Sequence, residues 1–194
     1  MEALTDKKRD ILQVATEIAS EIGLEALSIG KVSERAGMSK SGLFAHFKSK
    51  ENLQIQVLEY VTDRFQEEIF GAVLKETRGV ARLIKLSSCW ENWVKSAYAG
   101  GCPMFAAVME YDDHPGLVRT HLKRLFSQLY QSLEYMATQA QELGEFSERI
   151  DVKQFGFEYV GLMLGYHMSL RMMDETAAGI RFSASIASLI EHSR

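Results

Sequence analysis

The residues of this chain best suited to bind a ligand are the hydroxyl and basic side chains between Ser28 and Lys50. Ser28 and Ser39 each stand directly before a short helical pattern, where a serine oxygen can accept a hydrogen bond from an amide of the first turn. Lys40 follows Ser39 at once. Lysine side chains and the amides at the start of a helix both bind anions such as phosphate. This stretch is therefore a candidate phosphate-binding surface.

The same stretch divides into two short predicted helices, Ile29–Ala36 and Lys40–Phe47, around Gly37. Glycine readily adopts the left-handed conformation in which a chain leaves a helix. We expect Leu43 and Phe47 to face inward, which leaves the start of the second helix exposed. Two short helices joined by a glycine-containing turn form a helix-turn-helix, and its second helix can enter the major groove of DNA.

Charge is distributed unevenly along the chain, whose formal net charge is −4. The segment 31–50 contains one acid, Glu34, and five basic residues, for a net charge of +4: Lys31, Arg35, Lys40, Lys48 and Lys50. The remainder then has a net charge of −8. A basic segment on an acidic body suits a protein that presents one surface to nucleic acid, although a chance cluster on a solvated face would give the same count.

Two other groups of residues could do chemistry. A thiol-dependent enzyme would use Cys102 with His114 or His167, but we favour a buried, inert cysteine. A compact run of acids and a histidine could bind a metal ion, although we favour a role in capping the next helix: Glu110, Asp112, Asp113 and His114. With no glycine-rich phosphate loop and no convincing metal spacing, we predict no catalytic residue, no metal and no cofactor.

Composition indicates an all-α protein that resides in the cytoplasm. The chain has 194 residues, of which 46% are hydrophobic and 25% charged, with 2 prolines and 2 cysteines. Both fractions are near globular averages. Two cysteines are too few for a disulfide framework. No apolar run is long enough to span a membrane, and the first residues are charged rather than signal-like.

Apolar periodicity predicts helices along the whole chain. Besides the two short ones, we expect Asp6–Ile22, a long helix from Ser49, Val80–Ala99, helices opened by Pro103 and by Pro115, one from Asp151 to about Asp174, and Ala177–His192. The first has a stripe of six apolar residues: Ile11, Leu12, Ala15, Ile18, Ala19 and Ile22. In the long helix the apolar residues recur at every fourth position: Leu53, Val57, Val61, Phe65, Ile69 and Val73.

These features together resemble the TetR family of bacterial transcriptional regulators. The matching residues lie mostly in the first quarter of the chain: Ser28, Val32, Ala36-Gly37, Ser39, Gly42-Leu43, Phe44, Phe47, and Ser49-Lys50-Glu51 with Leu53. The resemblance implies a three-helix DNA-binding head at residues 1–48. A linker helix, and then a helical body for effector binding and dimerisation, would occupy residues 49–194.

The resemblance also implies which residues contact DNA: Ser28, Ser39, Lys40, Ser41, Gly42, Phe44, His46 and Lys50. Ser28 would reach a phosphate, while the residues from Ser39 to Gly42 open the recognition helix. Lys40 would read guanine, because an ammonium can donate to O6 and N7. His46 and Lys50 would contact the backbone. Phe44 departs from the family, which usually has tyrosine there; without a hydroxyl it would pack on a sugar or a thymine methyl.

A homodimer through the last two helices is expected from the resemblance, and two heads would then meet a near-palindromic operator. The helix that begins at Asp151 is apolar on nearly all sides, which requires cover on more than one side. Gly161 and Gly165, four residues apart, would let another helix approach closely. Alternatively, these glycines only make room for neighbours in the same chain.

The body is rich in aromatic residues and methionines, and the resemblance implies that some of them bind a small apolar or aromatic effector. Our candidates are Trp93, Met104, Tyr130 and His167. The predicted function is a ligand-responsive transcriptional repressor that an effector releases from its operator, and not an enzyme. The alternatives are an architectural DNA-binding factor without a ligand, and the thiol-dependent enzyme.

Overall fold

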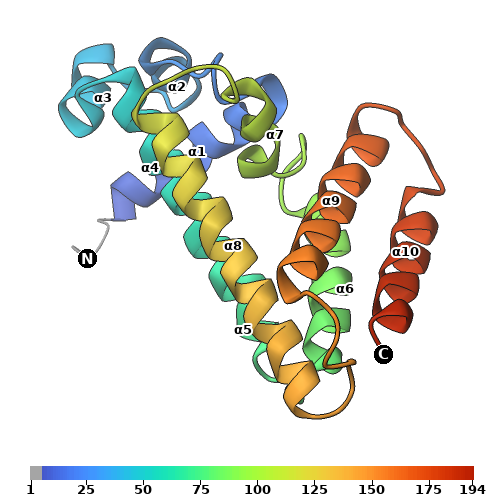
Figure 1. Ribbon diagram of the computed structural model, residues 1–194. Helices are drawn as coiled ribbons and strands as arrows, with labels where there is room; N and C mark the ends of the chain where they lie inside the picture. The colour runs from blue at the N-terminus through green and yellow to red at the C-terminus, as the bar shows by residue number, and fades with distance from the viewer. Residues whose placement is uncertain (1–5) are drawn as a thin grey trace. The chain divides into compact units, whose positions relative to one another are not determined.

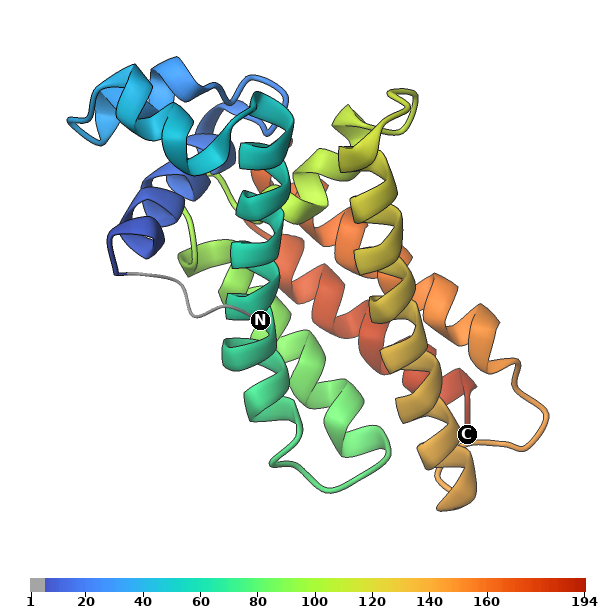
Figure 2. The ribbon, with the colours of Figure 1, turned by 90° about the vertical axis from the view of Figure 1, so that its left-hand side faces the viewer.

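The computed structural model describes residues 6–194, and every regular element in that range is helical (Figures 1 and 2). The elements are α1 Asp6–Ile22, α2 Ile29–Arg35, α3 Lys40–Phe47, α4 Lys50–Phe65, the π-helix η1 Gln66–Phe70, α5 Gly71–Val73, α6 Val80–Ser96, α7 Pro103–Glu110, α8 Leu117–Glu142, α9 Val152–Arg171 and α10 Ala178–His192. The all-α prediction is confirmed. Within the same range, no helix has the length and apolarity that crossing a membrane requires.

The chain forms two compact units. The first contains the described residues up to Arg64 together with Tyr98–Lys123, and the second contains Phe65–Ala97 and Arg124–Arg194. Helices α4 and α8 contribute residues to both units. The first unit thus includes α7 as well as the helix-turn-helix. The functional division after residue 48 stays a prediction.

In the first unit, α1, α2 and α3 pack in sequence around a small core. Leu12, Val32, Leu43 and Phe47 are at most 1% exposed. The apolar stripe predicted for α1 is buried apart from its last member. Ile22 is 45% exposed, because α1 ends there and the chain turns away at the next residue.

The linker helix contains a π turn that its sequence spacing explains. All six apolar residues at every fourth position, from Leu53 to Val73, are at most 3% exposed, as predicted. A straight α-helix has 3.6 residues per turn, so steps of four would rotate each residue about 40° past the last. The π turn at Gln66–Phe70 accommodates one additional residue and so offsets part of this rotation.

The two prolines behave differently at helix starts. Pro103 occupies the first turn of α7, as predicted, where its missing amide costs no hydrogen bond. Pro115 does not open a helix. Instead α8 begins at Leu117, after Gly116 in a conformation with φ +153°, and the Leu117 amide donates to the Glu51 carboxylate at 3.2 Å. The predicted cap by Asp113 or His114 is therefore wrong.

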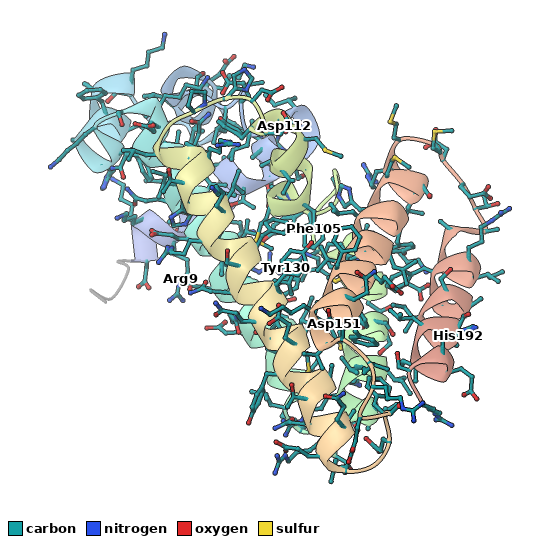
Figure 3. All side chains as sticks on the ribbon, viewed as in Figure 1. Arg9, Phe105, Asp112, Tyr130, Asp151 and His192 are labelled. Carbon is teal, nitrogen blue, oxygen red and sulfur yellow. The ribbon has the colours of Figure 1, made fainter. Side chains whose placement is uncertain are left out.

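In the second unit, α6, α9 and α10 pack against one another. Two buried side chains of this unit donate hydrogen bonds to backbone carbonyls of other helices: Trp90 Nε1 to Met163 O at 3.3 Å, and the Tyr159 hydroxyl to Leu83 O at 2.7 Å. Asp151 caps the start of α9, as predicted, by accepting from the Lys153 amide at 2.9 Å (Figure 3).

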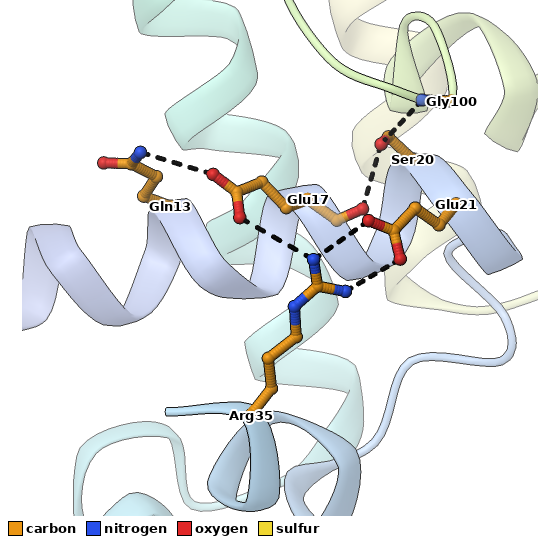
Figure 4. A network of polar contacts seen from close by, with 6 residues as sticks. All are labelled: Gln13, Glu17, Ser20, Glu21, Arg35 and Gly100. Carbon is orange, nitrogen blue, oxygen red and sulfur yellow. Dashed lines mark hydrogen bonds and ion pairs between the residues drawn. The ribbon is translucent and has the colours of Figure 1, made fainter. Parts of the chain in front are cut away.

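The loop before α7 contacts α1 through a glycine that has no room for a side chain. The Gly100 amide donates to the Ser20 hydroxyl at 3.2 Å (Figure 4). A Cβ atom on Gly100 would overlap the Ser20 carbonyl, which is backbone and cannot rotate away. The contact between this loop and α1 therefore requires glycine.

We predict that Gly100→Ala destabilises the protein by about 1–3 kcal/mol, the usual effect of overpacking a rigid contact. Gly71→Ala is the matched control, because the atom nearest to its new methyl is 3.8 Å away. That change should be neutral, or stabilising by up to about 1 kcal/mol through helix propensity. Urea unfolding of both variants measures the difference, and equal midpoints would contradict the close approach at Gly100.

Candidate functional site

Both serines predicted to cap the helix-turn-helix do so. The Lys31 amide donates to Ser28 Oγ at 3.3 Å, and the Gly42 amide donates to Ser39 Oγ at 3.1 Å. Gly37, between the two helices, has φ +64° as predicted. Each serine oxygen accepts from its own helix, and Ser39 Oγ also lies 3.3 Å from Ser41 Oγ, where either hydroxyl can donate. Capping is thus compatible with the predicted contacts to phosphate.

Helix α3 is buried on one side and open on the other. Leu43 and Phe47 are fully buried, and Phe44 is 55% exposed. The other predicted contact residues of the helix are exposed or half-buried: Lys40, Ser41, Gly42 and His46. The open side begins at the first turn, where backbone amides point outward.

Lys40 lies close to the start of α2. Its Cε is 3.6 Å from the point that a Cβ on Gly30 would occupy, and Ser28 Oγ is 3.8 Å from the same point. A hydroxyl and an ammonium from two helices therefore come together at one edge of the helix-turn-helix. The structure brings these two predicted residues into one small region.

Three of the basic side chains are held by partners. Arg35 donates to both carboxylate oxygens of Glu21, at 2.7 and 2.9 Å (Figure 4). Lys31 Nζ donates to the Ala26 carbonyl at 3.0 Å. Lys50, a predicted phosphate contact, pairs with Glu25 at 2.9 Å. Arg35 and Lys50 are thus paired with carboxylates, which reduces the positive charge available on this surface.

Lys48 is a basic residue next to α3 that is not in the predicted contact set. It is the C-cap of α3, its side chain is exposed, and its φ is +62°, which is unusual for a residue other than glycine. Glycine would meet this backbone requirement with less strain. Its position between α3 and Lys50 was a sequence signal that could have added it to the candidate DNA contacts.

The four predicted effector residues fall into both units. Trp93, Tyr130 and His167 belong to the second unit and Met104 to the first, where Thr62 Oγ1 lies 3.8 Å from its sulfur. Trp93 and Met104 are buried, at 3% and 4% exposure, and the other two are half-buried. Figure 3 places Tyr130 on α8.

His167 has the clearest ligand-like chemistry of the four. Its ring stacks on Trp90 with centroids 6.4 Å apart, and its buried Nε2 has no hydrogen-bond partner among residues 6–194. Burial, and then the positive charge of Arg171, lower the pKa of His167 to about 4, so the ring is neutral at pH 7. A neutral imidazole nitrogen can either donate to or accept from a ligand.

Hollows elsewhere in the second unit do not involve most of these residues. Trp93 borders one of about 190 Å³ with Cys89 and Asn92. Hollows of about 680 and 370 Å³ lie beside Val80 and between α6 and α10, and none of the four residues lines them. The grouping of the four residues into one effector site stays a prediction.

The residues considered for catalysis or metal binding have structural partners. Cys102 is fully buried at the start of α7. Glu110 accepts from the Glu25 amide at 2.7 Å, and Asp112 accepts from the amide of Asp113 at 2.8 Å. In residues 6–194, no three His, Cys, Asp or Glu side chains are grouped closely enough to hold a metal ion.

Helix α9 exposes an apolar face with two glycines in it. Phe157, Met168 and Met172 are 64%, 52% and 77% exposed, and a Cβ on Gly161 or Gly165 would meet nothing within 4 Å in the part of the chain that the structure describes. These residues recur at steps of three and four, so they share one face of the helix. Packing inside the chain therefore does not require glycine at either position.

Comparison with known proteins identifies two families of domain in this chain. Residues 11–57 match the model of bacterial regulatory proteins of the tetR family, and residues 79–186 match the tetracyclin repressor-like C-terminal domain. The transcriptional regulator RutR of Escherichia coli K12 is 38% identical over 61 residues, which are 31% of this chain and only 29% of RutR. The repressor DhaR of Mycobacterium sp. GP1 is 23% identical over 73% of this chain and 71% of its own length.

Solved structures share the fold over nearly the whole chain. A TetR transcriptional regulator from Chloroflexus aurantiacus superposes with a TM-score of 0.86 at 18% identity, covering 95% of this chain and 94% of its own. AibR, solved with isovaleryl coenzyme A and operator DNA, gives a TM-score of 0.75 at 20% identity, covering 93% and 96%.

We predict that Lys48→Gly stabilises the protein by about 1 kcal/mol, because glycine relieves the strain of a positive φ. The same variant should bind DNA more weakly, since a basic side chain next to α3 is lost. Lys40→Gly makes the same replacement at a helical position and should lower the free energy of unfolding by up to about 1 kcal/mol. Urea unfolding compares the two, and a loss of stability in both variants would contradict strain at Lys48.

Proposed function

We propose that this chain, a DNA-binding transcriptional regulator that belongs to the TetR family of bacterial regulatory proteins, is a repressor that a small effector releases from its operator. The observation on which this rests most is the open side of α3, held by two serine caps and a glycine turn. The relative DhaR, a repressor, supports the sign of regulation.

Recognition of DNA would use the exposed start of α3 in the major groove. The amides of its first turn and the hydroxyls of Ser39 and Ser41 would meet phosphates, which fix the position of the helix. Lys40 would donate to guanine, and Phe44 would contact a thymine methyl or a sugar. Ser28, His46 and Lys50 would contact the backbone. All of these residues are exposed or half-buried, which supports the assignment.

A homodimer through α9 and α10 would place two such surfaces on one operator. The exposed face of α9 supports it, because an apolar face of this kind on a single chain is usually covered by a partner. Open space around Gly161 and Gly165 supports close approach of a second helix. The two heads would then lie about one DNA turn apart, roughly 34–36 Å.

The effector would bind in the second unit, beside Trp93, Tyr130 and His167. The unpartnered Nε2 of His167 supports a ligand with an apolar or aromatic part and one hydrogen-bonding group. Because AibR was solved with isovaleryl coenzyme A, acyl thioesters are one class to screen. The division into a DNA-binding head at residues 1–48 and an effector body at residues 49–194 is part of this proposal.

Release from DNA would be a shift between two conformations with different effector affinities. Helices α4 and α8 each contribute residues to both units, so a change in the second unit has two continuous helices through which to act on the first. An altered spacing between the heads would then lower operator affinity. An effector that binds the protein and leaves its operator affinity unchanged would contradict this mechanism.

Selection of duplexes from a random-sequence library by the purified protein tests the DNA-reading role. The wild type should enrich a near-palindrome, and Lys40→Ala should lose preference at one position of each half-site, worth about 1–3 kcal/mol. Lys153→Ala removes the same charge from α9 and should leave the preference intact. Enrichment of no sequence by the wild type would refute specific DNA binding, and an unchanged profile in Lys40→Ala would refute the role of that lysine.

Insertion of a charged side chain on α9 tests the dimer. Gly161→Arg should convert the dimer to a monomer without unfolding the chain, because the new side chain meets open space within its own chain. Gln131→Arg, on the exposed surface of α8, is the matched control and should remain dimeric. Sedimentation measures the mass of both variants, and a dimeric Gly161→Arg protein would exclude this interface.

A further inference from the structure

The segment 98–117, called here the α7 segment, contacts the loop between α1 and α2 at Glu25. The Tyr111 hydroxyl donates to Glu25 Oε2 at 2.7 Å, and the Glu25 amide donates to the Glu110 carboxylate at 2.7 Å. The other carboxylate oxygen, Glu25 Oε1, accepts from Lys50 Nζ at 2.9 Å. All four residues belong to the first unit. Glu25 therefore joins the α7 segment to a lysine that is a candidate DNA contact.

The environment of Glu25 keeps it ionised. Hydrogen bonds from Lys50 and then from Tyr111 hold the pKa of the Glu25 carboxyl below its ordinary value, and His114 lowers it further. Burial has the opposite and smaller effect. At neutral pH a full negative charge thus lies against the Lys50 ammonium.

The α7 segment has further attachments that determine where Tyr111 lies. Near one end, Gly100 approaches the backbone of Ser20 and donates to its hydroxyl. At the other end, the Leu117 amide donates to Glu51, which directly follows Lys50. The Tyr111 ring is buried at 6% exposure, so its hydroxyl is held in place by packing. The hydrogen bond from Tyr111 to Glu25 is consequently one of several contacts that hold the α7 segment in place.

We infer that Glu25 is an internal competitor of DNA phosphate for Lys50, and that Tyr111 and Glu110 hold it in the competing position. This inference rests on the proposed DNA-binding function. A phosphate and the Glu25 carboxylate are both anions, so an ammonium that binds one must give up much of its contact with the other. Lys50 would have to leave Glu25 when it contacts DNA.

The strength of the ion pair suits such an exchange. The Lys50 and Glu25 side chains are 44% and 57% exposed, and pairs of this exposure are weak enough to open readily. A conformation of the α7 segment that holds Glu25 on Lys50 would lower DNA affinity, and one that withdraws Glu25 would raise it. Glu25 is a positioning residue in this account, because it acts on DNA through Lys50.

Binding to a fluorescein-labelled DNA duplex of random sequence tests the inference without knowledge of the operator. Fluorescence anisotropy across a series of KCl concentrations gives the affinity and its salt slope. Lys50→Gln should weaken binding and reduce the slope by about one phosphate contact. Glu25→Gln should tighten binding by about two- to fivefold, the range of an exposed ion pair.

Three comparisons separate competition from a general effect of charge or folding. Glu34→Gln removes one negative charge from exposed α2 and should change affinity less than Glu25→Gln does. In a Lys50→Gln background, Glu25→Gln should have no more effect than Glu34→Gln. Tyr111→Phe keeps the buried ring, and it should tighten binding by less than Glu25→Gln and have no effect once Glu25 is replaced.

The outcomes distinguish the inference from the function on which it rests. If the wild type does not bind the duplex, or if Lys50→Gln leaves the salt slope unchanged, the proposed DNA contact of Lys50 fails. If Lys50→Gln weakens binding but Glu25→Gln and Glu34→Gln change the affinity equally, the competition is refuted while the DNA contact of Lys50 stands. Weaker binding by Glu25→Gln, in a variant whose thermal unfolding matches the wild type, would mean that Glu25 orients Lys50 for DNA and would overturn the inference. If Tyr111→Phe binds the duplex with the same affinity as the wild type, the α7 segment has no part in the competition.

Discussion

Helix α3 has only 8 residues, and so short a helix does not form by itself in water, because nucleation costs more than its few hydrogen bonds return. Its stability must come from its neighbours. Here the Ser39 hydroxyl caps its first turn, and Leu43 and Phe47 are fully buried in the core with α1 and α2. Since one side of the helix is needed for that core, the proposed contacts with DNA are left with the opposite side. The small core therefore fixes both the rigidity and the extent of the surface that we propose meets DNA.

Local sequence patterns were sufficient to predict the helices and the caps of α2 and α3. They failed where residues far away in the sequence determine the start of a helix. The capping of α2 and α3 depends on neighbours within three residues, so Ser28 and Ser39 could be predicted. The start of α8 depends on Glu51, 66 residues away from Leu117, and local patterns around Pro115 could not reveal it. The π turn in the linker is an intermediate case, because steps of four in the apolar pattern already exceed the α-helical repeat.

The candidate effector residues illustrate a second limit. Trp93 and Met104 are buried to the same degree as ordinary core residues, and sequence has no signal that separates core from pocket. His167 is half-buried, its ring packs on Trp90, and its buried Nε2 has no hydrogen-bond partner among the described residues. An unpaired buried polar atom costs free energy unless something else satisfies it. Such an observation requires coordinates, because it concerns the position of one nitrogen relative to all its neighbours.

The positive charge of residues 31–50 also depends on residues outside that segment. Composition assigns +4 to residues 31–50, yet Arg35 and Lys50 are paired with Glu21 and Glu25, which lie before that segment in the chain. The charge that a phosphate meets is thus set by tertiary pairing as well as by composition. Glu25 is in turn bonded by Tyr111, 86 residues away, so part of the electrostatics of this surface is determined outside residues 1–48. Under the proposed role of Lys50 as a DNA contact, a small movement at Tyr111 would alter the affinity for DNA even if α3 itself did not move.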